Sequence, residues 1–130
     1  MAIKFRPKPG TILLCDFQGS IPPEMNKKRP VVVLSSVSER LCIVVPLSTT
    51  APHFPQKWHC VLHTQDTLPA PYDANTHWVK GDMVSTVSFE RLFLPRLGKD
   101  TDGKRIYDIK AVSPKDIKRT VGCENAALSP

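Results

Sequence analysis

The sequence predicts a mainly β fold: a small barrel followed by a C-terminal helix, with short helical turns at its periphery. Two observations predict this fold class. Short apolar runs rich in Val, Ile and Leu follow one another along the chain, and thirteen prolines mark many of the boundaries between them. A chain of 130 residues with 41% hydrophobic content is long enough for one core, so we expect residues 1–130 to form a single domain.

Each predicted strand is a run of branched or aromatic residues that is bounded by turn-forming residues. We expect strands at residues 11–17, 30–36, 42–47, 58–64, 78–84, 92–97 and 104–112. Residues 18–28 and 65–77 are the longest irregular connections, and sites tend to be built on such loops. Residues 99–103 contain Asp-Gly, which supplies the positive φ of a hairpin turn.

The C-terminal helix is predicted by its starting residues. Ser113 is a good N-cap, and Pro114 at the first helical position leaves no donor unsatisfied. The helix is expected to run to about Ala127, and a shorter helical turn is possible at residues 88–92. One apolar stripe should pack on the barrel or on a second subunit, and it consists of Ile117, Val121 and Leu128.

The charge favours an anionic partner. The formal net charge is +6 and the pI is about 9.3, so nucleic acid or an acidic protein would be attracted, although a modest lysine excess can also serve solubility alone. No stretch is long and apolar enough for a membrane span or a signal peptide. We therefore expect a cytoplasmic protein without a membrane partner.

The cysteines and histidines form no convincing ligand set. Cys15, Cys42, Cys60 and Cys123 contain no C-x-x-C pair, and a free thiol in an apolar strand behaves as a small core residue. His59 and His63 flank Cys60 with a spacing that suggests zinc, but no second pair is arranged to complete a tetrahedral site. We expect neither a metal nor another cofactor.

A pair of neighbouring segments carries the strongest functional signal. Arg29 opens the apolar run Val31–Ser35, and the hydroxyl cluster Ser48-Thr49-Thr50 ends the next strand. If the two strands are antiparallel, the arginine and the hydroxyls meet at one edge of the sheet. That arrangement suits the binding of a phosphate.

Four ordered sequence blocks resemble the MazF/PemK-type toxins of type II toxin–antitoxin systems. The resemblance covers roughly residues 9–92 and is less clear beyond Leu92. The blocks are residues 9–17 (PGTILLCDF), Glu24 with residues 29–35 (RPVVVLS), residues 44–49 (VVPLST) and residues 79–84 (VKGDMV). Four blocks in order are more specific than any one of them.

The resemblance implies an SH3-like barrel that forms a homodimer and is inhibited by a cognate antitoxin. It also implies a metal-independent endoribonuclease that cleaves single-stranded RNA. In that reaction the ribose 2′-hydroxyl attacks its own adjacent phosphate and leaves a 2′,3′-cyclic phosphate and a 5′-hydroxyl. Two alternatives remain open on this fold: a nucleic-acid-binding barrel without activity, and a protein-binding toxin of the gyrase-inhibiting type.

The resemblance assigns catalysis to Arg29 and to the hydroxyl of Ser48, with Thr49 as a substitute. A guanidinium seldom gives up its proton, so we expect Arg29 to stabilise charge on the phosphorane rather than to act as a base. Serine stands where most relatives have threonine, which removes the methyl group that fixes the rotamer.

The resemblance places four further residues in RNA binding or support. Glu24 lies on the loop before the Arg-Pro strand, where it could orient Arg29 or touch RNA, and Lys28 directly precedes that arginine. Lys80 and Asp82 lie on the later strand and could line the RNA groove or transfer a proton. Residues 22–23 are both proline, which should stiffen the loop and shift RNA preference.

Structural roles compete with each of these assignments. Arg29 and Glu24 could form a surface ion pair of less than about 1 kcal/mol. The hydroxyls of Ser48 and its neighbours could cap a turn, and Asp82 could anchor a loop backbone.

A further alternative is RNA cleavage by histidines. It arises from residues 52–77, which form a longer stretch than in compact relatives. All four histidines lie there, and a pair such as His59 and His63 can cleave RNA by acid–base catalysis. Three aromatic residues could stack on bases or pack in the core, namely Trp58, Tyr72 and Trp78.

Overall fold

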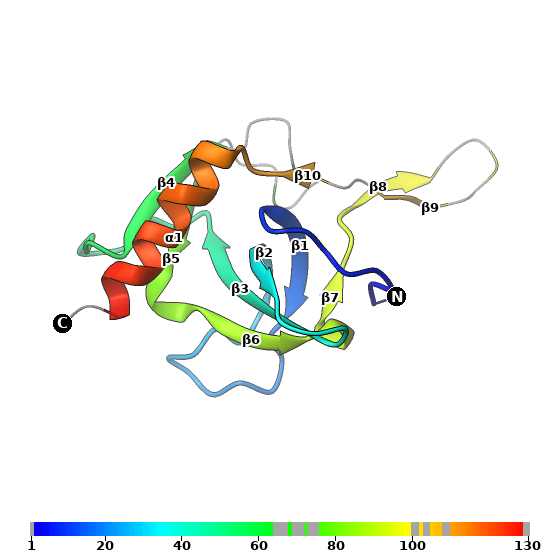
Figure 1. Ribbon diagram of the computed structural model, residues 1–130, viewed down its shortest axis with the longest axis horizontal. Helices are drawn as coiled ribbons and strands as arrows, with labels where there is room; N and C mark the ends of the chain where they lie inside the picture. Colours follow the sequence, from blue (N-terminus) through cyan, green and yellow to red (C-terminus); the bar gives the residue numbers. More distant parts are fainter. Residues whose placement is uncertain are drawn as a thin grey trace.

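The chain folds as an antiparallel β-barrel with one helix on its outside, which confirms the predicted fold class (Figure 1). The computed structural model describes residues 2–63, 68, 72, 76–99, 102, 105–107 and 110–128. Its strands are β1 (Thr11–Asp16), β2 (Lys28–Ser36), β3 (Leu41–Ser48), β4 (His59–His63), β5 (Thr76–Lys80), β6 (Ser85–Ser88), β7 (Leu92–Phe93), β8 (Arg96–Lys99), β9 (Arg105–Tyr107) and β10 (Lys110–Ala111). Two 3₁₀ turns, η1 (Gly81–Met83) and η2 (Phe89–Arg91), and the helix α1 (Pro114–Leu128) complete the described elements.

Strand β3 organises the barrel, because β5 and β6 pair with successive parts of the same β3 edge. The first half of β3 pairs with β6, and its last residues, Leu47 and Ser48, pair with β5. On its other edge β3 pairs with β2, which in turn pairs with β1. Strand β7 returns to β1 and closes the barrel, while β8 and β9 form a separate two-stranded sheet that projects from it (Figure 1).

The predicted strand at 78–84 is wrong in its second half. Strand β5 ends at Lys80, the chain turns through η1, and a separate strand β6 begins at Ser85. Gly81 explains the break, because a Cβ at this position would lie 2.6 Å from the carbonyl oxygen of Trp58 and 2.7 Å from that of Cys123. The backbone is therefore enclosed on two sides and cannot continue along β3 as a regular strand.

The later part of the chain is also more divided than predicted. The run at 92–97 consists of β7 and β8, and the run at 104–112 consists of β9 and β10. The helical turn expected at 88–92 is confirmed as η2, where Ser88 Oγ accepts a hydrogen bond from Glu90 N at 3.1 Å. The turn expected at 99–103 and the loop at 65–77 lie mostly outside the described residues.

Two hydrophobic clusters cover the two faces of the main sheet. The barrel interior is built from alternate residues of the first three strands together with β6 and β7, and its largest members include Leu13, Val31, Val33, Val44 and Leu92. The intervening residues face the other way, toward α1, and they include Ile12, Val32, Val45, Leu47 and Val79. Burial on both faces explains why β2 and β3 read as continuous apolar runs rather than as alternating ones.

The helix begins as predicted, with Ser113 Oγ accepting a hydrogen bond from Asp116 N at 3.2 Å. Its predicted packing stripe is only partly correct, because Leu128 is 68% exposed while Thr120 and Cys123 are buried. Helix α1 packs against η1, β4 and β5, and small side chains face the point where Gly81 approaches the helix backbone. Large apolar residues would not fit there.

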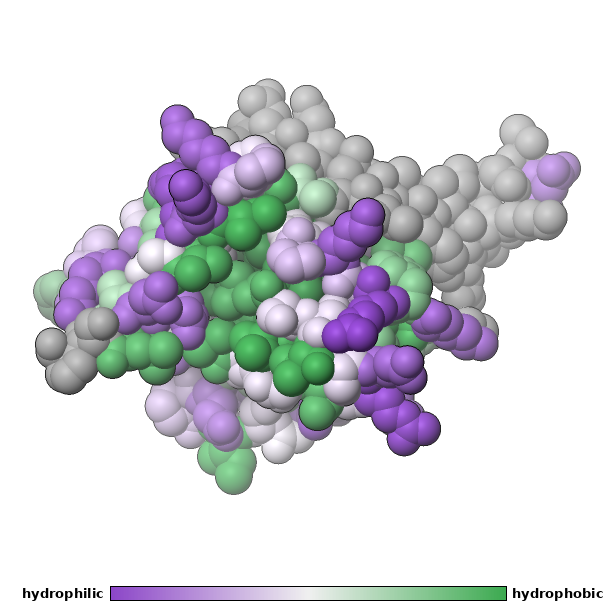
Figure 2. All heavy atoms as spheres, viewed as in Figure 1, coloured by the Kyte–Doolittle hydropathy of each residue, from purple (hydrophilic) through white to green (hydrophobic). Residues whose placement is uncertain are grey.

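The surface is mixed in character. From the viewpoint of Figure 1, apolar atoms gather near the middle of the face, and many hydrophilic side chains lie around them (Figure 2).

Cys15, Cys42, Cys60 and Cys123 are all free thiols, and burial raises the pKa of Cys15 to about 12. In the described ranges no helix has the length and apolar character needed to cross a membrane.

Candidate active site

Arg29 lies in the second position of β2, opposite Cys15 of β1, and its side chain is half-buried. Its Nε atom is buried and has no hydrogen-bond partner within the described part of the chain. A buried N–H without an acceptor costs roughly 1–3 kcal/mol, so this donor favours any ligand that supplies an oxygen. An anionic oxygen is the strongest acceptor for a guanidinium.

Lys80 and Asp82 flank Gly81, at the point where β5 passes into η1. Burial lowers the pKa of Lys80, and the positive charge of Arg29 lowers it further, while Asp82 acts in the opposite direction. Strands β2 and β5 both pair with β3 near the end of that strand, which places Arg29 and Lys80 at the same end of the sheet. Arg29 precedes Lys80 and Asp82 by about fifty residues in the chain.

Ser48 ends β3 at the same end of the sheet. The last ladder pair between β2 and β3 joins Val31 to Pro46, so Arg29 and Ser48 both lie two residues beyond this pair, at the same end of the two strands. The predicted antiparallel arrangement of the two strands is thus correct. On its other side Ser48 pairs with Trp78 of β5, whose position beside the hydroxyl could not be read from the sequence.

The hydroxyl of Ser48 is occupied by its own turn. Its Oγ accepts a hydrogen bond from Thr50 N at 3.1 Å and lies 3.4 Å from Thr50 O, while the residue is 7% exposed. Ser48 therefore caps a turn, which is the structural role that the sequence offers as an alternative to catalysis. Thr49 is exposed and follows directly.

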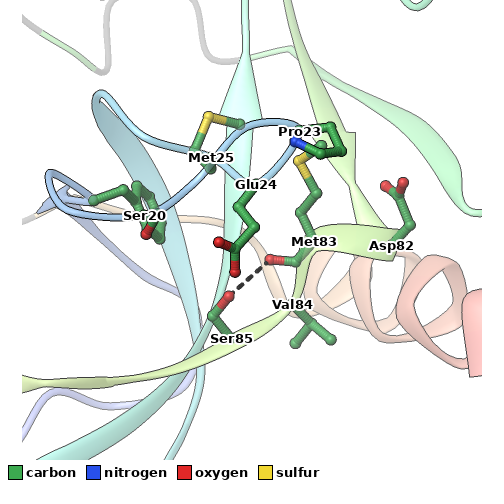
Figure 3. Close-up of a pocket in the computed structure, with 9 residues that line it drawn as sticks. Ser20, Pro23, Glu24, Met25, Asp82, Met83, Val84 and Ser85 are labelled. Carbon is green, nitrogen blue, oxygen red and sulfur yellow. Dashed lines mark hydrogen bonds between the residues drawn. The ribbon is translucent and has the colours of Figure 1, made fainter.

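Glu24 is hydrogen-bonded through its carboxylate within its own loop. Its Oε1 accepts a hydrogen bond from Ile21 N at 2.8 Å, and its own N–H donates to Ile21 O at 2.9 Å. The carboxylate lies at a cavity of about 410 Å³ between the β1–β2 loop and η1, to which Asp82 also contributes (Figure 3). Sequence reasoning missed Met25 and Met83, two further lining residues, because an isolated methionine gives no signal of a cavity.

Lys28 is separated from the cluster. Adjacent residues of a strand point to opposite faces, so Lys28 and Arg29 diverge. The Lys28 Nζ lies 4.7 Å from the ring centroid of Phe93, which is a cation–π contact on β7. Of the sequence-predicted residues, Lys28 is the one that the fold directs away.

Of the predicted pair His59 and His63, the structure describes the side chain of His59 alone. His59 lies opposite Lys80, and its Nδ1 accepts a hydrogen bond from Gln56 N at 2.9 Å. Burial lowers the pKa of His59, and Lys80 lowers it further. His77 is fully buried with its Nε2 3.2 Å from Tyr72 O, and the side chain of His63 lies outside the described part.

The tautomer of His59 follows from its hydrogen bond. A nitrogen that accepts an N–H carries no proton of its own, so neutral His59 holds its proton on Nε2.

Within the described ranges, no three His, Cys, Asp or Glu side chains are grouped so that they could hold a metal ion. The residues gathered at this end of the sheet are the cations Arg29 and Lys80, the carboxylate of Asp82 and the hydroxyls of Ser48 and Thr49.

A family model and curated proteins match this chain. The family described as PemK-like, MazF-like toxin of type II toxin-antitoxin system matches residues 8–112, farther than the sequence blocks indicated. The uncharacterized protein YifN of Escherichia coli (strain K12) is 38% identical over 112 residues, which cover 71% of this chain and 75% of YifN.

Solved structures share the fold. An endoribonuclease in complex with its cognate antitoxin, from Mycobacterial species, is 17% identical with a TM-score of 0.61, over 95% of this chain and 97% of that one. MazF (Form-I) from Deinococcus radiodurans is 18% identical with a TM-score of 0.58, over 97% of this chain and 99% of that one. At these identities the likeness concerns the fold.

Proposed function

Because this chain belongs to the PemK-like, MazF-like toxins of type II toxin–antitoxin systems, we propose that it is an endoribonuclease whose active site is formed by Arg29, Lys80 and Asp82. The single observation that carries the proposal is the buried, unpartnered Nε of Arg29. A phosphodiester supplies the oxygen acceptor that this donor lacks. A protein-binding surface would have no need of a buried guanidinium donor without an acceptor.

The proposed reaction uses the substrate's own nucleophile. The 2′-oxygen forms a bond to the adjacent phosphorus, the bond from phosphorus to the 5′-oxygen breaks, and a 2′,3′-cyclic phosphate remains. The 2′-hydroxyl loses a proton and the departing 5′-oxygen gains one. Arg29 and Lys80 stabilise the negative charge that grows on the non-bridging oxygens, which is the role of preorganised cationic donors.

Asp82 is the proton acceptor that the cluster offers, because a carboxylate is the basic group among its three charged residues. Ser48 and Thr49 supply hydroxyls beside the phosphate. Ser48 must release or share its contact with Thr50 in order to do so, whereas Thr49 is exposed.

The occupied hydroxyl of Ser48 favours a second candidate, a barrel that binds RNA without cutting it. One experiment separates the two. Purified protein is incubated with a long RNA in EDTA, and the fragments are mapped at both ends. Cleavage that leaves 5′-hydroxyl ends, and that stops when the scissile nucleotide is 2′-deoxy, supports the nuclease. Retention of intact RNA on the protein supports the binding module.

The partners of the proposed toxin follow from its charge and fold. A structural relative is described as an endoribonuclease in complex with its cognate antitoxin, and we propose that an acidic antitoxin segment covers the cationic site here as well. We also propose a homodimer, which light scattering at micromolar concentration tests. RNA and antitoxin should compete, so simultaneous binding of both would contradict inhibition by occlusion.

A further inference from the structure

The cavity beside the cation cluster has the size and walls of a base-binding pocket. Its volume of about 410 Å³ lies within the range of roughly 300–1,000 Å³ that is common for small-molecule sites. It opens between the β1–β2 loop and the segment that runs from η1 into β6 (Figure 3). The apolar lining comes from Phe17, Pro23, Met25, Met83 and Val84.

Thioethers and a proline ring provide a soft surface for a flat aromatic ligand. Methionine makes favourable contacts with aromatic rings and adapts to their shape. Met83 extends toward Pro23 in Figure 3, so the β1–β2 loop and η1 both contribute apolar atoms to the lining.

The polar side chains that line this cavity are two carboxylates, Glu24 and Asp82, and two hydroxyls, Ser20 and Ser85. The Glu24 carboxylate is directed into the cavity toward Ser85 (Figure 3). Ser85 Oγ donates its hydrogen to Met83 O at 3.2 Å, so this hydroxyl offers no proton to a ligand. Asp82 adds a second carboxylate. An electron-rich ligand edge, or a phosphate, would be repelled.

Glu24 is held in position before any ligand arrives. Its reciprocal hydrogen bonds with Ile21 use one of roughly four lone-pair positions on the carboxylate and leave the rest available. Residues 22–23, both proline, connect the two bonded residues and restrict the loop. Such an acceptor selects a partner that has two neighbouring donors.

We propose that this cavity binds a guanine base next to the scissile phosphate, with Glu24 accepting hydrogen bonds from the guanine N1–H and N2–H. Among the four RNA bases, guanine alone has two adjacent donors on its Watson–Crick edge. Adenine and cytosine place a ring acceptor beside the amino group, and uracil has one donor between two carbonyls. The inference rests on the proposed function, because it names the substrate preference of the same site.

Asp82 links the cavity to the cation cluster. It lines the cavity and also acts electrostatically on Lys80. A base in the cavity therefore lies beside the cations that would hold its phosphate. The Glu24 carboxylate inside the cavity disfavours a phosphate there, so the base end of the nucleotide would enter.

The test compares guanosine 3′-monophosphate with inosine 3′-monophosphate, which differs only in lacking the N2 amino group. The methyl groups of methionine are labelled with ¹³C, and each nucleotide is titrated by NMR. We expect the Met25 and Met83 signals to shift and guanosine to bind roughly 10-fold more tightly than inosine.

The matched variants are Glu24→Gln and Asp82→Asn. Glutamine keeps an acceptor for Ile21 N but presents an amide donor to the cavity, so we expect the preference for guanosine to disappear. Asp82→Asn should retain the preference. Equal binding of the two nucleotides to the wild-type protein, or a preference that depends on Asp82 instead of Glu24, would overturn the assignment.

A second arm uses an RNA strand rather than a free nucleotide. The oligonucleotides have a 2′-deoxy nucleotide at the scissile position, which blocks cleavage. The base beside this position is either guanine or hypoxanthine, the base of inosine. The same roughly 10-fold preference, removed by Glu24→Gln, is expected. Because binding needs no cleavage, a protein that shows the preference but never cuts RNA would contradict the proposed nuclease alone. A protein that cuts RNA without the preference would contradict only this inference.

Discussion

Gly81 N donates a hydrogen bond to the carbonyl oxygen of Trp58 at 3.0 Å, and this bond ties η1 to the segment that leads into β4. On the other side Gly81 faces the backbone of Cys123 in α1. The residues before and after it, Lys80 and Asp82, belong to the proposed active site. Their placement therefore depends on a close approach that only glycine permits.

Gly81→Ala should destabilise the fold and reduce cleavage. The added methyl group would meet three backbone atoms within 2.8 Å, and backbone cannot move aside as a flexible side chain can. We expect a loss of about 1–3 kcal/mol in the free energy of unfolding, measured by denaturant titration. Gly122→Ala is the matched control, since nothing lies within 4 Å of its Cβ, and it should stabilise the helix by about 0.5–1 kcal/mol.

Arg29→Ala should lower the cleavage rate by a factor on the order of 10² to 10³, as expected for the loss of a preorganised donor to a charged transition state. Single-turnover kinetics measure the chemical step, and circular dichroism checks that the fold survives. Arg29→Lys keeps the charge but loses the planar group of donors, so it should recover only part of the rate. Wild-type cleavage by the alanine variant would exclude Arg29 from the site.

Ser48→Ala should cost less than the Arg29 substitution if Thr49 substitutes for it. The variant also removes the acceptor of Thr50 N, so a small loss of stability is expected in addition. A double variant, Ser48→Ala with Thr49→Ala, should fall well below either single variant in kcat. If the two losses simply add, the hydroxyls do not substitute for each other.

As the pH rises, RNA binding should weaken at a lower pH than it would if Lys80 had the pKa of an exposed lysine. The pKa of Lys80 lies below 10.5, chiefly because of burial, so its ammonium loses the proton at lower pH than an exposed lysine does. A phosphate prefers the charged form. Binding of a 2′-deoxy-blocked oligonucleotide is measured from about pH 7 to about pH 10. Lys80→Arg stays charged over that range and should flatten the profile, whereas identical profiles would show that Lys80 does not contact phosphate.

A protein that carries both His59→Ala and His63→Ala should keep most of its activity. The Nδ1 of His59 is occupied by Gln56 N, and because its pKa is lowered the ring gains a proton only below its ordinary value of 6.5. The pH–rate profile between about pH 6 and about pH 8 should therefore resemble that of the wild type. A large loss of rate, or the loss of one limb of the profile, would support the paired-histidine mechanism instead.

The sequence predicts elements well where one local rule dominates. Ser113 and Pro114 identify the start of α1, and the cap is present at 3.2 Å. Strand β6 escapes prediction because Val87 is its only apolar residue and its pairing with β3 is a tertiary property. The same holds for the helix face, since the buried positions Thr120 and Cys123 are set by how α1 packs against η1 and the sheet, and that packing is a tertiary property.

The sequence predicts which residues gather at the candidate site, but it does not predict their hydrogen bonds or their burial. Antiparallel pairing of β2 with β3 brings Arg29 and Ser48 to the same end of the sheet, as their positions indicate. Neither the burial of the Arg29 Nε nor the bond from Ile21 to Glu24 follows from spacing, because each depends on loop geometry. The separation of Lys28 from Arg29 follows a simpler rule, which is that neighbouring residues of a strand face opposite ways.

The pairing of β1 with β10 joins residues that are far apart in the sequence, and this separation affects the order in which the strands pair during folding. Its partners Thr11 and Ala111 are about 100 residues apart, whereas Val31 and Pro46 of the β2–β3 hairpin are about 15 apart. Closing the longer loop costs roughly 1.7 kcal/mol more in chain entropy. The segment from Arg29 to Asp82 lies inside that loop, so β2, β3 and β5 can assemble through their shorter-range pairings before β10 joins the sheet. Slow steps in refolding should therefore report on β10 and spare the nucleotide site.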